Sequence, residues 1–183
     1  MAFKDKIITN VKTGQQIRFI QTSKDTNGEL LEMESTYLSG SKEPPPHYHP
    51  AQTEEFEVMS GEMSVRMDGK VLILQKGDRL HVPMNKEHSM WNHSRYKSVV
   101  NWKVRPALNT EYFFETAMGL SGGTKTNSDG MPNILQIALM VNRFRDVFRL
   151  AKPPYIVQRI LFGILTPFAL LSGYRAIYKK YLD

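Results

Sequence analysis

Residue types that bind metal ions gather in two short segments of this 183-residue sequence. His47 and His49 lie in the first segment, Glu54 follows shortly after them, and His88 lies in the second. In a β-strand, residues two apart project to the same face, so the first two imidazoles can reach one ion. Three neutral imidazole nitrogens and one carboxylate suit Fe, Mn, Ni, Cu or Zn better than Ca or Mg. The sequence therefore predicts a site for a divalent transition metal.

The choice of Glu54 among neighbouring acidic residues rests on the alternation of side chains along a strand. Glu54, Phe56 and Val58 share one face, and the two apolar residues mark that face as interior. Glu55 and Glu57 share the opposite face, which belongs in water. Glu54 is therefore the expected carboxylate ligand, and it could also leave the metal and accept a proton as a catalytic base.

The elements that must position these ligands are short strands separated by turns. Asp25-Thr26-Asn27-Gly28 is a strong turn signal, and Asp68-Gly69 is preferred in a two-residue hairpin. Many short strands at regular spacing predict a β-sandwich or a small barrel. The strands expected from the pattern are Gln16–Thr22, Leu30–Leu38, Met63–Met67, Lys70–Leu74 and Ser98–Val104.

The character of the sequence changes after Pro106, where helical patterns replace strands. A helix is expected over Glu111–Gly119 with Thr110 as its N-cap, and a longer one over Pro132–Leu150. The segment Ile160–Tyr174 carries no charge, but it is shorter than the about 20 apolar residues that span a membrane. Thr166-Pro167 is typical of the N-cap and first position of a new helix, so the pattern predicts two short helices there.

The two ligand segments resemble the paired motifs of the cupin superfamily over roughly residues 30–105. The first motif is Gly, five residues, His-x-His, three or four residues, Glu, six residues, Gly. This sequence matches it from His47 through Glu54 to Gly61, with Gly40 one residue early. The second motif is matched at Gly77, Pro83, His88 and Asn92. Asn85 replaces the middle glycine, and asparagine tolerates a left-handed backbone better than most other residues.

The resemblance implies a mainly β fold: a cupin barrel, also described as a double-stranded β-helix or jelly roll, with the metal inside one end. We expect the barrel to occupy residues 1–106. Residues 107–183 then form a C-terminal α-helical extension that packs on the barrel or on a partner subunit. Barrels of this family often dimerise, so a homodimer is expected.

Three further residues are expected to line the pocket of this barrel. Phe56 and Met90 share the strand parity of a proposed ligand and are therefore the expected wall residues. Asn92 matches the second motif and is expected to have a structural or ligand-orienting role rather than to bind the metal.

Composition and charge exclude some classes of protein. Cysteine is absent, which excludes disulfides, thiolate zinc sites and cysteine nucleophiles. The N-terminus has no apolar run of signal-peptide length, so a cytoplasmic location is expected. The net charge of +6 arises entirely from residues 141–183, where a solvated helix face is favoured over an acidic lipid surface. No nucleic-acid-reading motif is present, so no nucleic acid is expected as a partner.

Three functions fit these observations. The favoured one is a metal-dependent enzyme of the dioxygenase type, an oxidoreductase acting on a small organic molecule. The second is a non-catalytic cupin that binds or senses a small ligand. The third is a cupin tethered to a membrane surface by its basic, apolar C-terminal helices. An enzyme needs an accessible metal, whereas side chains can block the pocket of a binding module.

Overall fold

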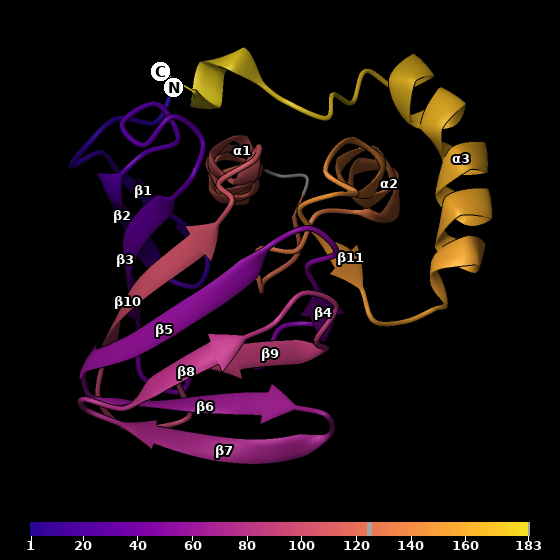
Figure 1. Cartoon of the computed structure of the whole chain (residues 1–183). Coiled ribbons are helices and arrows are strands. Elements are labelled where there is room, and N and C mark those ends of the chain that lie inside the picture. Colours follow the sequence, from indigo (N-terminus) through magenta and orange to yellow (C-terminus); the bar gives the residue numbers. More distant parts are fainter. Residues whose placement is uncertain (124–125, 183) are drawn as a thin grey trace.

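Two antiparallel β-sheets face each other, and helices cover one end of them (Figure 1). The computed structural model describes residues 1–123 and 126–182. The first sheet has the order β1 (Ile7–Thr9), β2 (Gln16–Gln21), β3 (Leu31–Tyr37), β10 (Ser98–Arg105), β5 (Thr53–Ser60) and β8 (Arg79–Val82). The second has the order β11 (Arg149–Leu150), β4 (His47–Tyr48), β9 (His88–Trp91), β6 (Glu62–Met67) and β7 (Lys70–Gln75).

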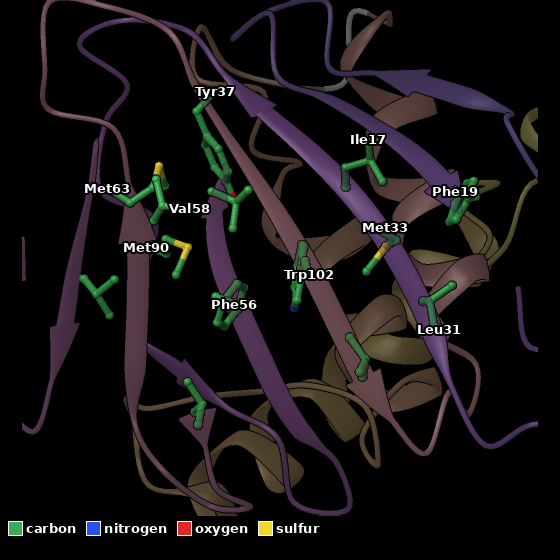
Figure 2. Packing of buried hydrophobic residues seen from close by; sticks show 14 of the residues in the cluster. Ile17, Phe19, Leu31, Met33, Tyr37, Phe56, Val58, Met63, Met90 and Trp102 are labelled. Carbon is green, nitrogen blue, oxygen red and sulfur yellow. The ribbon is translucent and has the colours of Figure 1, made fainter. Parts of the chain in front are cut away.

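The alternation of side chains along the strands decides which residues form the main core. In β3 and β10, every second residue is buried, and in β5 Glu54, Phe56 and Val58 are all buried while Glu55 is exposed. Trp102 of β10 lies between Met33 of β3 and Phe56 of β5 in the register of the sheet. These side chains fill the space between the sheets (Figure 2). Each fully buried large apolar side chain contributes about 1.5–3 kcal/mol to folding.

The turns that join the strands adopt the conformations that their residues predict. Asp68 and Gly69 have φ values of 49° and 77°, both in the left-handed region that a type I′ hairpin turn requires. Asn85 has a φ of 62°, so the turn of the second motif survives the loss of its glycine. These two turns deliver β7 and β9 to their places in the second sheet.

The helical region begins as expected and then departs from the sequence prediction. Helix α1 (Thr110–Ser121) has Asn109 rather than Thr110 at its N-cap position, and the Thr110 hydroxyl accepts a hydrogen bond from Gln52 instead. The helix predicted over Pro132–Leu150 is shorter, since α2 covers Ile134–Arg143. The chain then turns and forms β11, which pairs with β4 at the edge of the second sheet. Pairing with this strand satisfies backbone groups that a longer helix would have left open.

The prediction of two short helices near the C-terminus is wrong. One helix, α3 (Tyr155–Leu171), runs through Pro167, and a 3-10 turn follows at η1 (Lys179–Tyr181). Proline removes one helical N–H, but the carbonyl that loses its partner belongs to Gly163, which is exposed and open to water. The Thr166 hydroxyl donates to the Phe162 carbonyl within the helix rather than capping a new one. No helix in the described part of the chain is long and apolar enough to cross a membrane.

We predict that two glycines with the same backbone conformation differ in their tolerance of alanine. Gly61 and Gly69 have φ values of 75° and 77°. A Cβ at Gly61 would lie 2.6 Å from Ser98 Oγ and 2.7 Å from the Lys97 carbonyl oxygen, whereas at Gly69 it meets nothing within 4 Å. Gly69→Ala should cost about 1 kcal/mol from backbone strain alone. Gly61→Ala should cost about 2–4 kcal/mol in urea unfolding because steric overlap adds to that strain. Equal losses would contradict the packing described here.

Candidate metal centre

Three imidazoles and one carboxylate converge at the end of the barrel that the helices cover. His47 lies on β4 opposite His88 of β9 in the antiparallel register, and His49 follows at the end of β4. Glu54 reaches the same point from β5 in the other sheet. Ligand nitrogens of the three histidines all lie within 4.8 Å of one another. The four residues proposed from the sequence are thus neighbours, while His81 and His93 lie apart on the surface.

Glu54 is the buried acid at the centre of this group, with only 1% of its surface exposed. Its Oε2 lies 3.2 Å from His49 Nε2 and 2.9 Å from His88 Nε2. Its other oxygen, Oε1, accepts a hydrogen bond of 3.1 Å from the Trp102 indole nitrogen. Phe56 stacks on the Trp102 ring at 5.3 Å and fixes the indole in turn. One carboxylate oxygen is therefore held by the core, and the other faces the imidazoles.

Backbone carbonyls set the orientation of all three imidazole rings. Nδ1 of His47 lies 3.2 Å from the Pro45 carbonyl oxygen, and Nδ1 of His88 lies 3.0 Å from that of Lys86. Nδ1 of His49 lies 2.5 Å from the carbonyl oxygen of Val147. A ring that donates through Nδ1–H keeps its Nε2 lone pair free for a metal ion. The hydrogen bonds thus favour the same tautomer in all three rings, as a metal-binding site requires.

The nitrogens of the three histidines form a group that could hold a metal ion, and Glu54 Oε2 lies beside two of them. His49 Nε2 and Glu54 Oε2 are buried but make no hydrogen bond of acceptable geometry. Buried polar atoms of this kind normally have a hydrogen-bond or metal partner, so each of these two atoms still requires one. With metal–ligand bonds of about 2.1 Å, neighbouring donors at right angles lie about 3.0 Å apart. The distances from Glu54 Oε2 to the two imidazole nitrogens match that separation.

The charges in the centre are coupled. Burial raises the pKa of Glu54, but the adjacent His49 and His88 rings outweigh it and hold the pKa well below its usual range. Burial lowers the pKa of His49, yet the Glu54 carboxylate and the Val147 carbonyl outweigh that effect and raise it. Burial and the two other imidazoles lower the pKa of His47 to about 3. His47 is therefore neutral at physiological pH, and a bound cation would supply positive charge beside the Glu54 carboxylate.

The C-terminal extension supplies part of this centre. Arg149 and Leu150 of β11 pair with Tyr48 and His47 of β4, and Ala151 N–H donates to the Pro46 carbonyl. The Phe148 ring lies 4.8 Å from the His47 ring and stacks on Phe113 of α1 at 5.3 Å. Sequence reasoning missed Val147 and Phe148, because the segment was expected to continue a helix. The separate domains expected at 1–106 and 107–183 stay a prediction, although one strand of the second sheet comes from beyond residue 106.

The three predicted pocket residues have different surroundings. Phe56 and Met90 are buried in the main core cluster, and their role as pocket walls stays a prediction. Asn92 is fully buried, and its side chain donates to the carbonyls of Leu38 and Tyr96 and accepts from Ser94. These bonds tie together the loops at the far end of β9 from His88. Of the two roles weighed for Asn92, its contacts support the structural one.

Comparison with known proteins agrees with this fold. The family model described as "Cupin domain" matches residues 33–100. This segment of the chain is a domain of the cupin superfamily. A structure described as a predicted oxalate decarboxylase from Thermotoga maritima superposes with a TM-score of 0.50 at 15% identity, covering 58% of this chain and 99% of that one. At this identity the match shows the fold alone.

Two curated relatives are similar in sequence to this cupin. A quercetin 2,3-dioxygenase of Bacillus subtilis is 37% identical over 105 residues, which is 57% of this chain and 30% of that protein. The chain therefore aligns with less than a third of that relative's length. A probable oxidoreductase of Hypocrea virens, VirH, is 28% identical over 177 residues, which is 86% of this chain and 79% of that protein. The second alignment includes much of the extension, whereas the family match ends before Val147.

We predict that Phe148 shields His47 from small reagents. In the metal-free protein, Phe148→Ala should speed the modification of His47 by diethylpyrocarbonate severalfold, because a neutral imidazole loses its aromatic cover. Peptide mass spectrometry measures this rate, with exposed His81 as the internal reference. Phe168→Ala is the matched control, since that ring is 59% exposed on α3. An unchanged rate at His47 in Phe148→Ala would show that the ring does not cover the centre.

Proposed function

We propose that this cupin is a metal-dependent oxygenase that acts on a small aromatic molecule. The observation that carries the proposal is the group of three imidazoles, each with Nδ1 at a backbone carbonyl, two of which lie at one buried carboxylate oxygen of Glu54. The similarity to a quercetin 2,3-dioxygenase and to an oxidoreductase supports oxidative chemistry. It also makes quercetin the first substrate to test.

The residues that would hold the ion are His47, His49, His88 and Glu54. A divalent transition metal bound there would act as a Lewis acid and as a template that brings a substrate oxygen close to dioxygen. If the ion is six-coordinate, two positions remain for these ligands. The identity of the metal, among Fe, Mn, Ni, Cu and Zn, is for measurement to decide.

Glu54 has a second role in this proposal, as the base that accepts a proton from a substrate hydroxyl. Trp102 holds Oε1, so Oε2 is the oxygen that can receive the proton. A carboxylate with a lowered pKa is a weak base when it is paired with imidazoles. When one of those contacts is lost, burial is opposed by fewer favourable contacts and the proton affinity of Glu54 rises. The substrate would therefore have to displace Glu54 from a partner before the transfer.

The aromatic side chains beside the histidines exclude water from this chemistry. Phe148 lies over His47, and Phe113 stacks behind Phe148. Together they present apolar surface where a planar substrate could stack. Exclusion of water also strengthens every electrostatic interaction at the metal.

A second candidate function is a non-catalytic cupin that binds or senses a small ligand. The position of Phe148 favours this function, because its ring occupies the side of the centre next to His47. The pairing of β11 with β4 holds Phe148 in that position. In this case the metal would hold the ligand or the fold, and no turnover would occur.

We predict that single histidine substitutions separate the metal ligands from the surface histidines. His47→Ala and His88→Ala should lower metal affinity by more than about 100-fold, since each removes a ligand rather than an outer partner. His81→Ala and His93→Ala are the controls and should retain the metal content of the unmodified protein. Elemental analysis after dialysis measures the content. Unchanged metal in the two ligand variants would remove the proposed centre.

We predict that Glu54→Gln separates metal binding from catalysis. The amide keeps the shape of the carboxylate but cannot accept a proton, so oxygen uptake with quercetin should fall by about 10²–10⁴-fold. Metal content should fall far less, because three imidazoles remain. An oxygen electrode measures uptake by the chain loaded in turn with each candidate metal. Quercetin binding without uptake for every metal would contradict the enzyme and favour the binding module.

A further inference from the structure

A stripe of apolar side chains runs along the outer face of α3. Its members lie three or four residues apart and share one side of the helix: Ile156, Ile160, Ile164, Phe168 and Leu171. They are exposed by 63%, 60%, 59%, 59% and 86% of their surface. The opposite side buries Gln158, Phe162 and Ala169, and α3 packs there on α2. Figure 1 shows α3 at the outer edge of the protein, with α2 between it and the sheets.

Basic residues flank this stripe without acidic partners. Arg159 is the charged residue of α3, Lys152 precedes the helix, and Arg175, Lys179 and Lys180 follow it. Residues 147–182 contain no aspartate or glutamate. Within the described chain, none of these five cations forms an ion pair with a carboxylate. The surface around α3 is thus both apolar and positively charged.

A small cavity between α2 and α3 is lined by two cations, Arg145 and Arg159. It has a volume of about 170 Å³, and Asn142, Arg145, Tyr155 and Arg159 are among the residues that line it. Two guanidinium groups with a phenol nearby suit a phosphate or another compact anion. The Asn142 amide already donates to the Phe162 carbonyl and the Thr166 hydroxyl. Arg159 belongs both to this cavity and to the edge of the stripe, so an anion here would lie beside the apolar side chains.

We propose that α3 binds in the plane of an anionic lipid bilayer. The stripe enters the boundary between headgroups and acyl chains, and the flanking cations contact lipid phosphates. Arg145 and Arg159 hold one lipid phosphate in the cavity between α2 and α3. The proposal is independent of the metal centre and of its chemistry.

A membrane-crossing helix or a second copy of the chain fits this surface less well. With 17 residues, α3 is about 25 Å long, whereas the hydrocarbon layer is about 30 Å thick. A symmetric dimer through the stripe would bring two sets of unpaired cations together, and residues 147–182 offer no carboxylate to separate them. An anionic surface meets both the apolar and the charged features.

Vesicle flotation of the full chain tests the proposal. We expect binding to vesicles of phosphatidylcholine with a quarter phosphatidylglycerol, and at least tenfold weaker binding to phosphatidylcholine alone or in high salt. Ile160→Glu with Ile164→Glu should reduce binding at least tenfold. Arg145→Gln with Arg159→Gln should reduce it severalfold on the anionic vesicles. Ile73→Glu is the matched control, because Ile73 is 51% exposed on β7 and should have no effect.

Three results would overturn the proposal. The first is the absence of flotation of the unmodified chain with anionic vesicles. The second is equal flotation of the Ile160→Glu/Ile164→Glu variant, while circular dichroism shows that its fold is unchanged. The third is a dimer in light scattering that the same variant dissociates, without any flotation of the unmodified chain. That third result would assign the stripe to a second copy of the protein.

Discussion

The buried carboxylate of Glu54 imposes a constraint that the rest of the site must meet. An isolated charge at this depth would cost several kcal/mol, and the cost is recovered only through opposite charge and hydrogen bonds. The Trp102 indole donates a hydrogen bond to one oxygen, and the imidazole nitrogens of His49 and His88 lie beside the other. Those imidazoles come from strands of the opposite sheet, so the pairing of the two sheets and the electrostatics of the centre depend on each other. A divalent cation would supply the opposite charge that the same carboxylate requires.

The extension after the matched domain completes the site rather than merely following it. The Val147 carbonyl orients His49, and β11 covers the edge of β4, the strand that carries His47. A cupin domain limited to residues 33–100 would leave that strand edge open and His49 without its backbone partner. The chain runs from β11 into α3 within a few residues, so the exposed helix directly follows the strand that covers β4.

Local patterns in the sequence predict much of the barrel and the four candidate ligands. Alternation along β5 separates Glu54 from Glu55, because residues of one parity enter the core. Asp68-Gly69 and Asn85 predict the turns in which they lie, because few residue types adopt a positive φ without strain. The two-residue spacing of His47 and His49 places both rings on one face, and the family motif adds His88. These features depend on short-range rules, and short-range rules can be applied to a sequence.

The features that escape prediction depend on contacts between distant segments. Arg149 and Leu150 form a strand because β4 offers an edge, and nothing near them in the sequence indicates that partner. Pro167 does not interrupt α3 because the carbonyl that loses its hydrogen bond, that of Gly163, is exposed to water. Gly163 is exposed because it lies outside the side of α3 that packs on α2. The helical periodicity of residues 132–150 is real as far as Arg143, but it cannot show where tertiary pairing takes over. The roles of Val147 and Phe148 therefore become visible only in the folded chain.

A crystal structure of the metal-loaded protein, with anomalous data at the absorption edge of the metal it contains, would show whether the three imidazoles and Glu54 bind one ion. We expect one strong peak about 2.0–2.2 Å from Nε2 of His47, His49 and His88 and from Oε2 of Glu54. A peak at another place, with Glu54 still paired to the imidazoles and no ion among them, would contradict this expectation.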